Sequence, residues 1–134
     1  MASLTGWLAA AAIVLAGLVP ILARVRQGRR AAPSSPAIRG HVVLGLSTSA
    51  LAFAHTLSII GALGSPAATA GGMLALVPGG LAFFVLMAHT GIGLQLRDEK
   101  LRQRPSKRRT HLTTAITISV LVALHAGVLL RAAQ

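Results

Sequence analysis

Charged residues divide the chain into long apolar runs. No Asp, Glu, Lys or Arg occurs in residues 1–23, 41–96 or 111–130. A membrane-spanning helix needs about 20 mainly apolar residues, so the outer two runs suit one span each, whereas the central run suits two. Gly64-Ser65-Pro66 and Gly71-Gly72 interrupt the central run. We therefore expect four helices, over about residues 3–23, 38–63, 72–96 and 111–130.

This pattern predicts an all-α integral membrane protein, a four-helix bundle that runs up-down-up-down. The 134 residues suit a single domain, residues 1–134, and 54% of them are hydrophobic. Trp7 would anchor the first helix at the lipid–water interface, and Pro20 would be tolerated as a kink near the other end of that helix. Pro78-Gly79-Gly80 predicts a kink or a close helix approach in the third.

The positive charge predicts how the chain lies in the membrane. The net charge of +11 falls mainly in two loops, residues 24–39 and 97–109, whereas the loop 64–71 is uncharged. The positive-inside rule then places both basic loops in the cytoplasm and both termini outside a cytoplasmic (inner) membrane. This distribution is a topology signal rather than a stripe that binds nucleic acid. The basic residues follow the first apolar run, unlike those of a cleaved signal peptide.

Four histidines repeat along the second and fourth predicted helices. His41 and His55 are fourteen positions apart, as are His111 and His125, and the second pair follows the first by seventy positions. Fourteen residues are two heptads, with a drift of about 40° on a straight helix, so each pair shares one helix face. The two members are separated by roughly 21 Å along the helix axis.

Alternation of the spans makes the second and fourth helices parallel, which brings the histidines to two matching levels. His41 and His111 define the inner level, and His55 and His125 the outer level. Ionisable residues in hydrocarbon are costly and usually functional. The alternative is that the four imidazoles only form hydrogen bonds between helices, with Ser and Thr side chains that are plentiful nearby, such as Ser47, Thr48, Thr117 and Ser119.

Two imidazoles at each level fit haem better than a lone metal ion. Zinc prefers four close ligands, whereas haem iron needs only two axial ligands and the macrocycle is apolar. We therefore expect two haem b groups, with propionates met by Arg39, Arg108 or Arg109. The chain has no cysteine, which excludes disulfides, thiolate-ligated clusters and covalent C-x-x-C-H haem attachment. Glycines would leave gaps for the macrocycle at Gly17, Gly45, Gly79, Gly80, Gly91 and Gly93.

His89 lies on the third predicted helix, outside the repeat. Ala88-His89-Thr90 copies the triplet Ala54-His55-Thr56. The sequence leaves three roles open for His89: a hydrogen bond that supports the site, contact with a quinone, or replacement of one of the four predicted ligands.

The doubled H-x13-H spacing resembles the diheme four-helix core of the cytochrome b subunit of quinol–cytochrome c oxidoreductases. It is also similar to ferric-reductase-type membrane domains. The resemblance implies bis-histidine ligation of two b haems, by His41 with His111 and by His55 with His125. The expected function is that of an electron-transfer subunit in a larger respiratory or photosynthetic redox complex, rather than a complete enzyme.

Two alternatives stay open. One is a quinone-reactive membrane anchor of a dehydrogenase, which would use His89, Asp98 or Glu99. The other is a haem-free structural or assembly subunit, in which the histidines would only hold helices together.

Overall fold

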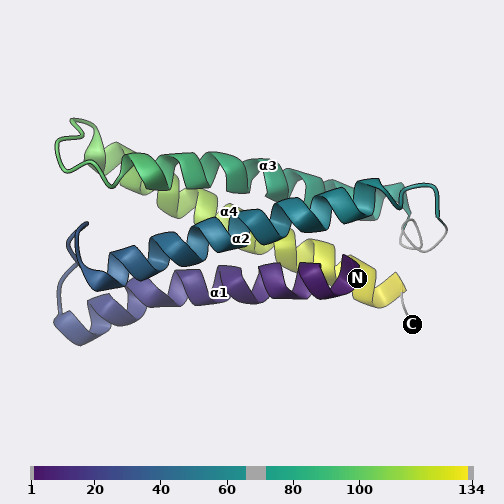
Figure 1. Cartoon of the computed structure of the whole chain (residues 1–134), viewed down its shortest axis with the longest axis horizontal. Helices are drawn as coiled ribbons and strands as arrows, with labels where there is room; N and C mark the ends of the chain where they lie inside the picture. Colours follow the sequence, from purple (N-terminus) through teal and green to yellow (C-terminus); the bar gives the residue numbers. More distant parts are fainter. Residues whose placement is uncertain (1, 66–71, 133–134) are drawn as a thin grey trace.

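The structure, a computed structural model, describes residues 2–65 and 72–132. It contains four α-helices in up-down-up-down order, each long and apolar enough to cross a membrane. They are α1 (Ala2–Gln27), α2 (Pro36–Ile60), α3 (Met73–Gln95) and α4 (Arg104–Ala132). The α1–α2 and α3–α4 connections lie at one end of the bundle, and both chain ends lie at the other (Figure 1). The predicted fold class, a multi-pass membrane bundle, is confirmed.

Local sequence explains where the first two helices end and begin. Gly28 follows α1 with a φ of +64°, a left-handed conformation that favours glycine and commonly ends a helix. Ser35 then caps α2, because its hydroxyl accepts a hydrogen bond from the Ile38 N–H at 3.4 Å. Pro36 occupies the first turn of α2, where its missing N–H would have no partner in the helix.

The predicted helix bounds need correction at several ends. The predicted basic loop 97–109 is wrong in its second half, because α4 already begins at Arg104. Arg and Lys are good helix formers, and Pro105 suits a first helical turn. Arg104 also donates two hydrogen bonds of 2.8 Å, to the Leu96 and Asp98 carbonyls, which hold the α3–α4 loop against the start of α4.

The remaining differences are smaller. The basic loop 24–39 is shorter than predicted, because α1 extends to Gln27 and α2 begins at Pro36. The second helix ends at Ile60 rather than at residue 63, since Gly61 caps it. Of the predicted break between the second and third helices, residues 66–71 lie outside the described residues.

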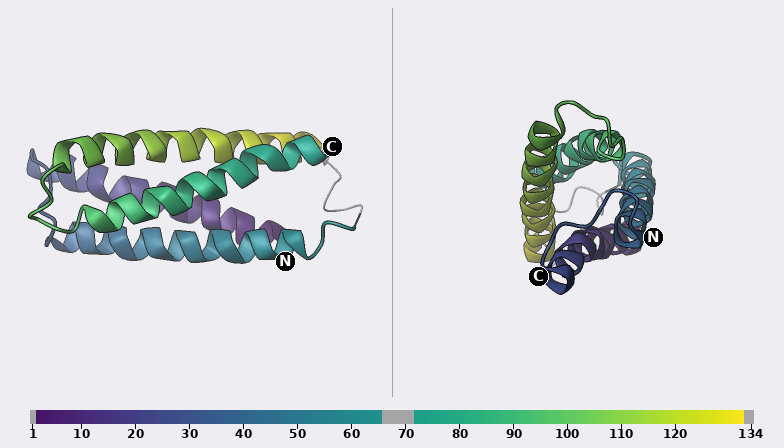
Figure 2. Two further views of the ribbon diagram at one scale, coloured as in Figure 1. Left: turned by 90° about the horizontal axis from the view of Figure 1, so that it is seen from above. Right: turned by 90° about the vertical axis from the view of Figure 1, so that its left-hand side faces the viewer.

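The helices pack as two hairpins. α1 packs mainly along α2 and α3 mainly along α4, whereas α2 contacts α3 over a smaller area and α1 barely contacts α4. Viewed from the end, α2 and α4 lie diagonally opposite each other (Figure 2). The contact between hairpins includes a Ser49–Thr90 hydroxyl hydrogen bond of 2.8 Å and the rings of Phe53 and Phe83.

Alanines spaced by heptads allow the close approach within each hairpin. Among the described residues the buried side chains are few and mostly small, and they lie on α1 and α3 as Ala9, Ala16, Ala23, Ala75, Ala82 and Leu86, with Thr48 on α2 and Ile118 on α4. Small residues let helix backbones approach in a membrane, where helix association depends on van der Waals packing. The large apolar side chains mostly point outward, toward the lipid.

We predict that Ala9→Leu weakens the α1–α2 hairpin. Ala9 is only 7% exposed, so the three carbon atoms that leucine adds cannot be accommodated without moving α2, at a cost of about 1–3 kcal/mol. Unfolding of purified protein by sodium dodecyl sulfate, followed by circular dichroism, measures this loss. Ala11→Leu is the matched control, because Ala11 is exposed. Equal stability of the two variants would contradict the packing described.

Candidate functional site

The structure brings His41 and His111 together across the diagonal of the bundle. Their ring centroids are 6.1 Å apart and the rings are nearly perpendicular, at 89°. They belong to different hairpins, His41 to α2 and His111 to α4. The two inner-level residues selected from the sequence therefore face each other.

His41 is oriented by a backbone carbonyl of the neighbouring helix in its hairpin. Its Nδ1 lies 2.8 Å from the Ala16 carbonyl oxygen on α1. Because a carbonyl only accepts hydrogen bonds, Nδ1 carries the proton and, in the neutral ring, Nε2 keeps its lone pair. Pro20 explains why this carbonyl is available: it lacks the N–H that would otherwise bind the oxygen four residues earlier.

His125 is held in the same way in the other hairpin. Its Nδ1 donates to the Ala75 carbonyl of α3 at 2.9 Å. Pro78 lies within one turn of this carbonyl, inside α3. The ring packs directly on Gly79, where a Cβ atom would come within 2.9 Å of it. The close approach predicted from Pro78-Gly79-Gly80 thus occurs, with an imidazole as the neighbour.

His55, the other outer-level residue, also turns toward its hairpin partner. Its Nδ1 lies 3.3 Å from the Thr5 hydroxyl on α1, and its ring packs on Gly6, where a Cβ atom would be 3.0 Å away. Both outer histidines therefore bind a residue fifty positions earlier in the chain. The contact within the second hairpin thus repeats the contact within the first, with both residues seventy positions later in the chain.

His111 differs from the other three. Its ring packs on Gly93 of α3, with a Cβ distance of 3.0 Å. Its Nδ1 atom is buried and has no hydrogen-bond partner among residues 2–65 and 72–132. A buried nitrogen without a partner is costly, so this atom identifies the place in the described structure where a polar group is least satisfied.

His89 joins the inner level from α3. Its ring stacks on that of His111, with centroids 3.8 Å apart and an angle of 12°, and its Nδ1 lies 2.8 Å from the Thr114 hydroxyl. That hydroxyl also lies 3.0 Å from the carbonyls of Thr110 and His111, to which it donates its proton. Nδ1 of His89 is therefore the donor to Thr114 when the hydroxyl proton is directed to one of these carbonyls.

The position midway between the two levels is tightly packed. Thr48 lies seven residues from both His41 and His55, and its side chain is 2% exposed. Ile118 occupies the equivalent place on α4 and is 3% exposed. The imidazoles are more accessible than these two side chains. On both α2 and α4, the face that carries the histidines is therefore fully buried midway between the two levels and partly exposed at the histidines themselves.

Sequence reasoning missed the groups that orient the rings. Of the glycines expected to leave gaps, Gly79 and Gly93 contact imidazoles, whereas Gly17, Gly45, Gly80 and Gly91 have nothing within 4 Å of an added Cβ. Gly6, Thr5 and Thr114, which contact the imidazoles, were not among the site residues predicted from the sequence. The signal that could have found one acceptor is Pro20, which frees the oxygen four residues before it.

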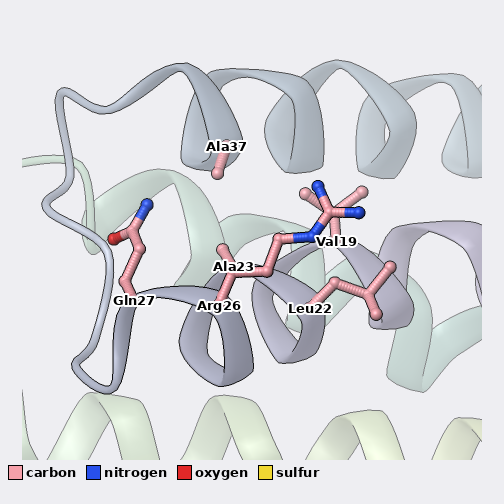
Figure 3. Close-up of a pocket in the computed structure, with 6 residues that line it drawn as sticks. All are labelled: Val19, Leu22, Ala23, Arg26, Gln27 and Ala37. Atoms are coloured by element: carbon pink, nitrogen blue, oxygen red, sulfur yellow. The ribbon is translucent and has the colours of Figure 1, made fainter.

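The arginines proposed for propionates lie in two places. Arg39 is exposed on α2. Arg108 and Arg109 instead line a cavity of about 240 Å³ with Pro105 and Arg30, a residue from the α1–α2 loop that sequence reasoning missed. A second cavity, of about 290 Å³, lies between the end of α1 and the start of α2, with Arg26 above a mainly apolar lining (Figure 3).

Comparison with known proteins identifies no family. No protein-family model, curated protein or solved structure matches the chain. Within the described residues, no group of three or more His, Cys, Asp or Glu side chains could hold a lone metal ion. Function must therefore be inferred from the histidines and from the groups that orient them.

We predict that Gly79→Ala displaces the His125 ring. The new Cβ would lie 2.9 Å from the ring, so the imidazole must move and its hydrogen bond to Ala75 must lengthen. Overpacking of this kind costs about 1–3 kcal/mol. Nitrogen NMR of labelled histidine, together with unfolding in sodium dodecyl sulfate, measures both effects. The control is Gly80→Ala, whose Cβ meets nothing within 4 Å. An unchanged His125 signal in Gly79→Ala would refute the contact.

Proposed function

We propose that the protein is a diheme b-type cytochrome subunit that carries electrons across the membrane between two bis-histidine haems. His41 and His111 would hold the inner haem, and His55 and His125 the outer haem. The chain would act as one subunit of a larger redox complex.

The spacing of the inner pair carries this proposal. An iron–imidazole nitrogen bond is about 2 Å long, so two axial imidazoles on one iron have ring centres roughly 6 Å apart. His41 and His111 have this separation, 6.1 Å, although they come from helices that lie diagonally opposite. Edge-to-face packing of two rings covers about 4.5–7 Å, so the spacing supports the proposal together with the hydrogen bonds that orient the rings.

The hydrogen bonds at Nδ1 support the same assignment. Metal-bound histidines usually donate their other ring N–H to a carbonyl or carboxylate, which fixes the tautomer and the ring direction. His41 and His125 already do so, at Ala16 and Ala75. Their Nε2 atoms therefore carry the lone pair that an axial ligand needs. When bound, haem b supplies a one-electron iron couple.

The outer level is proposed by analogy with the inner one within the chain. His55 and His125 occupy equivalent positions of the repeat. The Nδ1 atom of each is oriented by a residue fifty positions earlier, Thr5 for His55 and Ala75 for His125. The four imidazoles would provide two nitrogen ligands for each haem iron, which would disfavour O2 binding. Arg39, near His41 in sequence, is our candidate for a propionate of the inner haem.

The arrangement in the membrane follows from the charges. Both basic loops lie at one end of the bundle, the end of the inner histidines. We place this end in the cytoplasm and both termini outside a cytoplasmic membrane. In this proposal, electrons would enter and leave through other subunits of a respiratory or photosynthetic complex.

Two rival functions make different predictions. In a haem-free structural subunit, the Nδ1 hydrogen bonds would serve only to hold the hairpins together. In a quinone-reactive membrane anchor, His89 would receive a quinol proton at Nε2, because its Nδ1 is engaged in the hydrogen bond with Thr114. Quinol-linked haem reduction that His89→Ala abolishes would favour the anchor.

We expect the purified protein to contain two haems per chain. Reduced-minus-oxidised spectra with pyridine haemochrome quantification measure the number directly, and low-spin bis-histidine ligation gives a sharp Soret band and alpha bands. A protein that takes up no haem during expression with excess haem precursor would overturn the proposal and favour the structural subunit.

We expect loss of one histidine to remove one haem. His55→Ala should eliminate the outer haem and leave the inner signal, and His41→Ala should do the reverse, because each pair belongs to one level. His89→Ala should keep both haems, since its ring is assigned to neither. If His55→Ala and His89→Ala retained the same haem content, the assignment of His55 would be wrong.

A further inference from the structure

A cluster of arginines at the basic end of the bundle plays no part in the proposed electron path. Arg30, in the α1–α2 loop, and Arg108 and Arg109, in the first turns of α4, line one cavity of about 240 Å³ with Pro105. A water molecule occupies about 30 Å³, so the cavity has room for a larger group. It joins segments nearly eighty residues apart.

The positive charges in this cavity are not neutralised by the described residues. Arg30 and Arg104 are close enough to Arg108 to repel its charge. Arg104 is already engaged with the Leu96 and Asp98 carbonyls. The Asp98 carboxylate accepts a hydrogen bond from the Lys100 N–H in its own loop. The guanidinium groups that line the cavity are exposed and have no carboxylate beside them in the described part of the chain, so they are free to bind an anion from outside.

The surface beyond the cavity is apolar. Leu112 and Ile116, one and two turns beyond Arg108, are exposed and form a short apolar stripe on α4, because each step of four residues turns the side chain by only about 40°. Leu112, one turn from Arg108, is 63% exposed. A cationic pocket therefore lies at the end of a short apolar stripe, at the boundary between the charged end of the bundle and its membrane spans.

We propose that the cavity formed by Arg30, Arg108, Arg109 and Pro105 binds the phosphate group of an anionic phospholipid. The guanidinium groups bind the phosphate oxygens, and one acyl chain lies along the stripe that begins at Leu112. The stripe is what selects a phospholipid over a free phosphate ion. The neighbouring cavity beside Arg26 has a single arginine and a mainly apolar lining, so it lacks the charge for this ligand.

Native mass spectrometry of the detergent-solubilised full chain tests this site, with phosphatidylglycerol as the probe and phosphatidylcholine as the neutral comparison. We expect one tightly retained phosphatidylglycerol and no comparable retention of phosphatidylcholine. Arg30→Gln and Arg108→Gln should each weaken retention by at least about tenfold, because each removes a charge-assisted contact. Arg30→Lys should retain part of the affinity.

Arg102→Gln is the matched control, because Arg102 is an exposed arginine at the same end that does not line the cavity. Arg102→Gln should weaken retention of phosphatidylglycerol by no more than about fivefold, which is the effect of removing a general surface charge. Arg30 lies outside the helices, so its variants should fold normally, which circular dichroism checks. Equal losses in Arg102→Gln and Arg30→Gln would overturn the site.

Two further outcomes would also overturn the lipid assignment. If inorganic phosphate displaced phosphatidylglycerol at equal concentration, the cavity would be a site for the free ion. If phosphatidylglycerol bound only to haem-free protein, propionates would occupy the cavity instead. Lipid retention that is the same with and without haem supports the lipid site. Haem quantification tests the proposed function independently of this result.

Discussion

The hydrogen bond from a histidine Nδ1 to a carbonyl of the neighbouring helix is the interaction on which the rest of this structure depends. In hydrocarbon a polar ring edge must be satisfied by protein, yet helix carbonyls are normally used within their own helix. Pro20 solves this for His41 by leaving the Ala16 oxygen available. The ring is then fixed in direction and tautomer, and α1 and α2 are held in register at the same point.

The sequence predicted the scaffold well because membrane spans have a strong signature. Uncharged runs and basic loops located all four helices, and the alternation of the spans placed His41 and His111 at one level, where their rings meet. The start of α4 was placed too late because a helix can extend beyond the membrane, where charged residues favour it as much as apolar ones do. Charge marks where a span ends, not where a helix ends.

The orienting groups could not be predicted with the same success, for a physical reason. Ala16 and Ala75 act through backbone oxygens, which every residue has, so their side chains carry no signal. Gly6 matters because His55 packs on it, which depends on helix register rather than on either residue alone. Arg30 lies far in sequence from Arg108, and their shared cavity follows only from how the hairpins pack.

The hydrogen bonds that orient the histidines all lie within a hairpin, whereas the facing rings of His41 and His111 lie between hairpins. Each half of the chain can therefore insert and arrange its own imidazoles before it meets the other half. A ligand held by both rings would therefore connect the two hairpins last, after each has formed. Cofactor supply would then govern final assembly rather than membrane insertion, and a shortage would leave two complete but loosely joined hairpins.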